Sequence, residues 1–135
     1  ASYFPDRTLI AETGSTIRLR IHNRLAQPHE LAIHGAGPDR SDASSGPIAP
    51  GATGILELRA PAPGTYLYSD PTNAPVERTL GLFGALVVID PQQAWHLGPA
   101  GPEFERQWLW LCHDVVPEWA RVASRGGTVR PGGTD

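Results

Sequence analysis

The amino-acid sequence predicts a single all-β domain, built as a sandwich or barrel of short strands. Apolar and polar residues alternate along several short segments, with the period of two that is typical of a half-buried strand. Gly (15) and Pro (14) are frequent and fall between these segments, where turns are expected. The chain lacks the regular helical periodicity of a βαβ fold, so a parallel α/β architecture is excluded.

The first half of the chain contains most of the alternating segments. In the clearest of them, Ile17, Leu19 and Ile21 share one face and polar side chains occupy the other. Gly35–Gly51 is rich in Gly, Pro, Ser and Asp, and we expect it to form a long loop. The expected strands are a short one at Leu9-Ile10 and longer ones at Ser15–Asn23, His29–His34 and Gly54–Arg59.

The second half begins with two expected strands, after which the strand pattern is interrupted. Tyr66 and Tyr68 share a face of an expected strand over Thr65–Ser69, and the nearly continuous apolar run Leu82–Ile89 predicts a central strand. Pro91–Gly101 breaks the pattern. Beyond it we expect a strand over Phe104–Cys112 and a short helix around Pro117–Ala123, capped by Asp114 and ended by Gly126-Gly127. The expected organisation is a domain over residues 1–90, a linker over 91–103, and an extra strand, short helix and flexible tail over 104–135.

Charge and composition exclude several functions. The net charge is -3 and no cluster of basic residues occurs, whereas nucleic-acid binding requires clustered cations. The longest apolar run, Leu80–Ile89, is far shorter than the ~20 residues of a membrane-spanning helix. The single cysteine, Cys112, rules out an internal disulfide and a four-cysteine metal site within one chain.

Four motifs, in order along residues 7–90, carry a resemblance to the first domain of laccase-like multicopper oxidases. This resemblance implies a cupredoxin-like Greek-key β-sandwich. The motifs are the strand Gly14–Leu25, similar to "GDTVRVRLHNRL"; Pro28–Gly35, similar to the surroundings of His-Trp-His-Gly; Pro63–Tyr68, similar to "PGTYWYH"; and Leu80–Asp90, similar to "GLYGALIV".

The resemblance also implies where copper ligands would lie. In that family, two His-x-His pairs on neighbouring strands supply half the ligands of a three-copper cluster that reduces oxygen, and the last domain supplies the rest. Here the first pair reads Ala32-Ile33-His34, and the second reads Ser69-Asp70-Pro71. His34 is the one remaining ligand of four. We therefore expect this chain to bind no copper cluster and to perform no catalysis alone.

Three residues are the candidate metal ligands: His34, Cys112 and His113. A type 1 copper site uses one Cys, two His and often a Met, but the chain has no Met, and adjacent strand residues point in opposite directions. We therefore expect Cys112 to be a buried structural thiol. His22, His29 and His96 are expected to be ordinary polar residues. Core packing is the default interpretation of the four Trp residues. Alternatively, Trp108 or Trp110 covers a partner surface.

Three functional hypotheses follow. The leading one is a structural or interaction module of an oxidase-like assembly, with a protein partner or self-association through the C-terminal segment. The second is one part of an active copper-dependent oxidoreductase whose copper-bearing domains lie elsewhere. The third is a small mononuclear copper carrier that uses Cys112, His113 and His34. The resemblance implies a secreted or periplasmic location.

Overall fold

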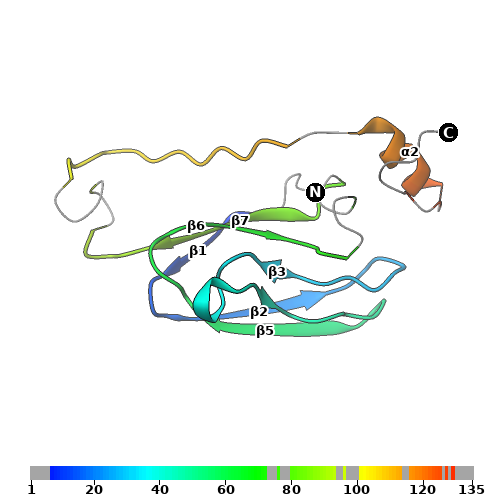
Figure 1. Ribbon diagram of the computed structural model, residues 1–135, viewed down its shortest axis with the longest axis horizontal. Helices are drawn as coiled ribbons and strands as arrows, with labels where there is room; N and C mark the ends of the chain where they lie inside the picture. Colours follow the sequence, from blue (N-terminus) through cyan, green and yellow to red (C-terminus); the bar gives the residue numbers. More distant parts are fainter. Residues whose placement is uncertain are drawn as a thin grey trace.

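The computed structural model describes residues 7–72, 76, 80–93, 96, 101–113, 116–125, 127 and 129. Two sheets form most of this part of the chain, and an α-helix lies at its periphery (Figure 1). The strands are β1 (Leu9–Glu12), β2 (Thr16–His22), β3 (Ala32–Ile33), β4 (Ala43–Ser44), β5 (Thr53–Arg59), β6 (Gly64–Ser69) and β7 (Phe83–Ile89). A short 3-10 helix, η1 (Pro38–Arg40), precedes β4, and α2 covers Pro117–Ser124.

The two sheets face each other as a sandwich. One has the strand order β1-β7-β6-β3-β4, and the other consists of β2 paired antiparallel with β5. β1 runs parallel to β7 in the five-stranded sheet. Because β2 belongs to the other sheet, the chain crosses between the sheets after β1. The predicted all-β class is confirmed. β7 lies between β1 and β6, as expected of the most apolar segment.

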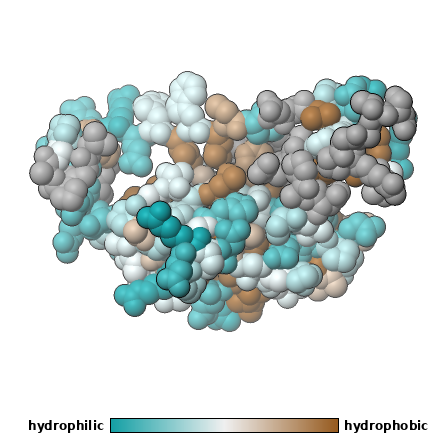
Figure 2. Space-filling model, viewed as in Figure 1, coloured by the Kyte–Doolittle hydropathy of each residue, from teal (hydrophilic) through white to brown (hydrophobic). Residues whose placement is uncertain are grey.

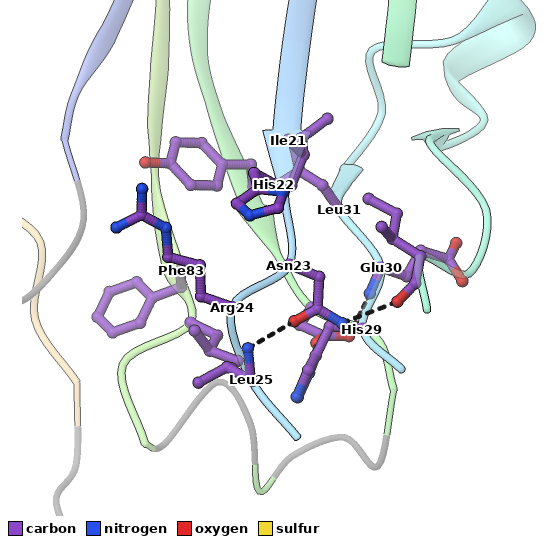
Figure 3. Close-up of a pocket in the computed structure, with 13 residues that line it drawn as sticks. Ile21, His22, Asn23, Arg24, Leu25, His29, Glu30, Leu31 and Phe83 are labelled. Carbon is purple, nitrogen blue, oxygen red and sulfur yellow. Dashed lines mark hydrogen bonds and ion pairs between the residues drawn. The ribbon is translucent and has the colours of Figure 1, made fainter. Parts of the chain in front are cut away.

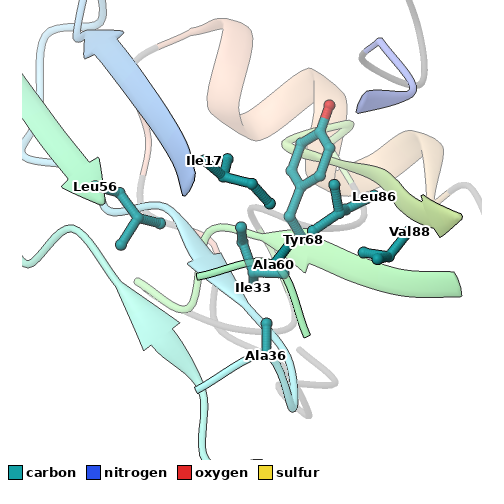
Figure 4. Packing of buried hydrophobic residues seen from close by; sticks show 8 residues of the cluster. All are labelled: Ile17, Ile33, Ala36, Leu56, Ala60, Tyr68, Leu86 and Val88. Atoms are coloured by element: carbon teal, nitrogen blue, oxygen red, sulfur yellow. The ribbon is translucent and has the colours of Figure 1, made fainter. Parts of the chain in front are cut away.

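The core lies between the sheets. Figure 4 shows Ile17 of β2 gathered with Ile33, Tyr68 and Leu86 of the five-stranded sheet. Ile33 and Leu86 are 0% and 1% exposed. The alternation predicted for β2 is observed, because its apolar residues face this core while its Arg residues face solvent.

Tyr68 packs across β6 and β7 onto a residue without a side chain. Gly84 is its direct partner in the antiparallel pair, and a Cβ at Gly84 would lie 2.3 Å from the ring. The tyrosine hydroxyl donates a hydrogen bond to the Arg7 carbonyl oxygen at 2.5 Å. Gly84 is therefore required by the close packing of the ring, which also ties the segment before β1 to the core.

Two expected strands differ from the structure. The strand expected over His29–His34 is reduced to Ala32–Ile33, because side chains occupy the preceding backbone donors. Glu30 N–H donates to Asp70 and Leu31 N–H donates to Ser45. The segment Phe104–Cys112 is described without strand pairing, so the expected strand there is wrong.

The C-terminal segment runs beside the five-stranded sheet, on the side away from β2 and β5 (Figure 1). Trp108 and Trp110 are 77% and 82% exposed, so core packing is wrong for these two residues. The expected short helix is confirmed as α2, but its N-cap is Val116 instead of Asp114. No helix in the described residues is long and apolar enough to cross a membrane. The division into domain, linker and tail stays a prediction.

Burial of Ile33 should account for a large part of the stability of the fold. We expect Ile33→Ala to lower the free energy of unfolding by about 2–5 kcal/mol, because it opens a cavity between the sheets. The matched control is Ile10→Ala on β1, where the side chain is 70% exposed and the loss should stay below about 1 kcal/mol. Urea denaturation of both variants measures the difference. Equal losses would contradict the placement of the core.

Candidate functional site

His34 lies just after β3 and contacts two side chains. Its Nε2 is 2.7 Å from Ser69 Oγ, and its Nδ1 is 2.9 Å from Asp42 Oδ2. The pairing of β3 with β6 produces this cluster, because it sets Ala32 opposite Ser69 and Ile33 opposite Tyr68. Ile33 and Tyr68 face the core. The alternation of strands therefore puts Ala32 and Ser69 on the outer face of the sheet.

The hydrogen bonds of His34 indicate which ring nitrogen carries the proton when the imidazole is neutral. Gly35 N–H donates to Asp42 Oδ1 at 2.9 Å. This bond, followed by the bond from His34, lowers the pKa of the Asp42 carboxyl below its ordinary value of 3.8. An ionised carboxylate only accepts hydrogen bonds, so His34 Nδ1 carries the proton that it donates to Asp42. In the neutral ring, Nε2 then accepts the proton of the Ser69 hydroxyl.

Burial differs sharply across this cluster. Ser69 is 4% exposed, whereas the side chains of His34 and Asp42 are 36% and 51% exposed. In the C-terminal segment, the His113 ring contacts Phe83, the β7 partner of Ser69, at a centroid distance of 4.9 Å. The cluster therefore extends from a buried hydroxyl to a solvent-facing carboxylate.

The other two candidate metal ligands lie in the C-terminal segment. Cys112 is exposed, so the prediction of a buried thiol is wrong. Within the described residues, no three His, Cys, Asp or Glu side chains come close enough to form a metal site. His22 and His96 are exposed, as expected of ordinary polar residues. Copper binding by His34, Cys112 or His113 stays a prediction.

A second histidine–carboxylate pair lies at one end of the sandwich. His29 Nδ1 is 2.5 Å from Asp70 Oδ2, and their side chains are 15% and 4% exposed. Asp70 Oδ1 accepts the Thr72 N–H at 2.7 Å and the Glu30 N–H at 3.4 Å. The buried carboxylate therefore anchors both the segment before β3 and the loop after β6.

The His29–Asp70 pair lines a pocket of about 320 Å³ (Figure 3). Asn23 shapes its wall. It is 5% exposed, donates to the Gln27 and Ile48 carbonyls and accepts the Leu25 N–H. These bonds hold the turn after β2. The remaining wall is mostly apolar and includes Ile21, Leu31, Tyr68, Leu82 and Phe83.

The sequence did not reveal all the partners of these histidines. It identified Ser69 and Asp70 only as replacements for copper ligands, and it gave no role to Asp42. Asp42 lies in a Gly- and Ser-rich loop, where only the path of the chain brings it back to His34. His29 and Asp70 are 41 residues apart. Their positions at the ends of two neighbouring expected strands were the available signal.

Comparisons with known proteins agree on the family. The sequence profile described as "Multicopper oxidase" matches residues 2–93, more than half of the 135-residue chain. Dihydrogeodin oxidase from Aspergillus terreus is 31% identical over 133 residues, covering 84% of this chain and 22% of that protein. Oxidoreductase tpcJ from Aspergillus fumigatus is 30% identical over 122 residues, covering 82% and 19%. The chain thus spans about a fifth of these relatives.

Solved structures agree on the fold. A multicopper oxidase of known structure is 32% identical, with a TM-score of 0.56, and the match covers 66% of this chain and 33% of that one. An auracyanin from Roseiflexus castenholzii is 22% identical, with a TM-score of 0.54, and covers 62% of this chain and 85% of that one. These likenesses show that the sandwich has the cupredoxin fold, as the sequence predicted.

The buried and exposed histidine–carboxylate pairs should differ in energy. We expect Asp70→Ala to lower the free energy of unfolding by about 2–4 kcal/mol, because it removes a buried carboxylate that accepts hydrogen bonds from His29 and Thr72. Asp42→Ala is the matched control. It should cost about 1 kcal/mol or less, because its pair is exposed to solvent. Chemical denaturation near neutral pH tests this, and a larger loss in Asp42→Ala would contradict it.

The lowered pKa of Asp42 predicts a weak dependence of stability on pH. A carboxyl whose folded pKa lies below its unfolded value stabilises the fold above the unfolded value and loses that effect as the pH falls through the folded value. We therefore expect the stability difference between wild type and Asp42→Asn to be largest above about pH 5 and to shrink below about pH 4. Denaturation curves at several pH values measure it. A difference that grows towards low pH would contradict the sign.

Proposed function

Because this chain belongs to the multicopper oxidase family, we propose that it is a cupredoxin domain that has given up copper binding and serves as a structural and docking unit of a larger oxidase-like protein. The main observation behind this proposal is which residues occupy the four positions that match the copper ligands of the family. Ala32 offers no donor atom, Ser69 offers a hydroxyl and Pro71 offers no side-chain donor, so His34 alone keeps its imidazole.

The contacts of His34 support this proposal. Both ring nitrogens already have protein partners, Asp42 and Ser69, at hydrogen-bonding distance. A copper ion at Nε2 would displace the Ser69 hydroxyl and would find no second imidazole among the matched positions. Copper in proteins is held by several convergent nitrogen or sulfur ligands. The residues at this position therefore do not fit the family's copper cluster.

A docking role is supported by the C-terminal segment. Trp108 and Trp110 expose most of their surface on an extended stretch of chain, and apolar side chains are visible between this stretch and the sandwich (Figure 2). Exposed aromatic residues of this size are typical of protein interfaces. We propose that the segment binds a protein partner, with the remainder of a longer oxidase-like protein as the first candidate. Location outside the cytoplasm is part of the proposal and rests on family membership alone.

A second candidate function is that of one domain of an active copper oxidase whose copper ions are held elsewhere. The two curated relatives, named as an oxidase and an oxidoreductase, favour it, since this chain matches only about a fifth of each. Under that proposal, this domain contributes packing and docking, and the oxidation occurs in other domains. Oxygen consumption by a longer protein that contains this domain, but not by this chain alone, would support it.

Copper loading of the purified chain tests the main proposal. After incubation with Cu(II) and removal of excess metal, we expect much less than one copper per chain, no strong blue absorption and no oxidation of a phenolic dye. The matched variant Ser69→His puts a second imidazole beside His34 and should raise Cu(II) affinity about tenfold or more. Its circular dichroism must match wild type.

Bound copper would overturn the proposal. About one copper per wild-type chain, together with a strong blue band, would assign a type 1 site to Cys112 and favour the electron carrier. Bound copper that disappears in His34→Ala but not in Cys112→Ser would instead show a site at the retained family ligand.

A further inference from the structure

The side chains Ser69, His34 and Asp42 form a chain of hydrogen bonds with a specific order of atoms. Ser69 Oγ contacts Nε2 of the imidazole at 2.7 Å, and the opposite nitrogen, Nδ1, contacts Asp42 Oδ2 at 2.9 Å. The second carboxylate oxygen is held by Gly35 N–H. This is the order of a nucleophile, a general base and a group that orients the base, which defines a serine triad irrespective of the fold.

We propose that Ser69, His34 and Asp42 act as a catalytic triad for acyl transfer from small activated esters. Two of the geometric features of such a triad are present. The nucleophile lies within hydrogen-bonding reach of its base, and the base lies within reach of its orienting carboxylate. The two ring nitrogens of His34 have separate partners: Nδ1 contacts the Asp42 carboxylate, and Nε2 contacts the Ser69 hydroxyl.

The reaction uses only the ester and water. Ser69 Oγ forms a bond to the ester carbonyl carbon, and the bond from that carbon to the alcohol oxygen breaks. The hydroxyl proton passes to His34 Nε2 and from there to the departing alcohol oxygen. Water then attacks the acylated Ser69 by the same proton route, which releases a carboxylic acid and restores the hydroxyl. No oxidant, metal or cofactor takes part.

The surroundings of Ser69 restrict the substrate. The neighbouring Asp70 N–H already donates to the Leu82 carbonyl, and the register of β3 and β6 uses Ser69 itself in the ladder with Ala32. A backbone donor for the developing oxyanion is therefore not supplied by these two residues, and one such donor is worth about 10²–10³ in rate. Since Ser69 is also 4% exposed, the triad should act only on short acyl groups with good leaving groups.

The second histidine–carboxylate pair provides an internal comparison. His29 Nδ1 contacts Asp70 in the same way, but no hydroxyl among the described residues forms a hydrogen bond with its ring. His29 therefore lacks the nucleophile that His34 has. Ser44, which is paired with Ala32 across β3 and β4, provides a matched serine that bonds to Glu30 instead of an imidazole.

Acylation of the purified chain by p-nitrophenyl acetate tests the proposal. We expect release of p-nitrophenolate and one acetyl group per chain, located on Ser69 by peptide mass mapping. Ser69→Ala should abolish that label, Asp42→Asn should slow its formation at least about tenfold, and Ser44→Ala should behave as wild type. Thermal unfolding of each variant verifies that it is folded.

Labelling by a second reagent gives an independent test. Methanesulfonyl fluoride, a small reagent that sulfonylates activated serines, should modify Ser69 in wild type and leave His34→Gln unmodified at that position. Acetyl groups found only on histidines or on the N-terminus, or a Ser69 that resists both reagents in the folded chain, would overturn the triad. Failure here would leave the proposed absence of copper untouched, because copper loading is measured separately.

Discussion

The antiparallel pairing of β3 with β6 is the interaction on which both faces of the five-stranded sheet depend. It puts Ile33 beside Tyr68 on the inner face, where both contribute to the core, and Ala32 beside Ser69 on the outer face. A shift of one residue would exchange these faces and bring Ser69 into the core. The core packing that stabilises the sandwich therefore also determines which side chains can meet His34.

That pairing separates the residues that form the core from the positions that match the copper ligands of the family. The hydrophobic residues that specify the fold lie on the inner face, whereas three of the four family ligand positions fall at Ala32, His34 and Ser69 along the outer side of β3 and β6. Substitutions on the outer face leave the inner packing intact. Thus the inner-face residues of these strands determine the fold, whereas the positions that match the family's metal ligands lie on the outer face.

The regular strands were predictable from sequence because each has a clear period and turn residues at its ends. β2, β5, β6 and β7 lie within one residue of their expected starts and ends. The region around β3 was not predictable in detail, since side chains of Asp70 and Ser45 bind backbone donors that a regular strand would use. Such bonds depend on residues distant in sequence, and local patterns carry no information about them.

The candidate site was predictable only where the family resemblance pointed to it. His34 and Ser69 were identified as former ligand positions, but their mutual hydrogen bond and the contribution of Asp42 required the path of the loop through η1 and β4. A buried hydroxyl beside an imidazole costs little when each satisfies the other, whereas a lone imidazole facing an empty ligand position would lose a partner. Ser69 therefore gives the His34 imidazole a hydrogen-bond partner at a position that matches a copper ligand of the family, and the proposed triad rests on the same contact.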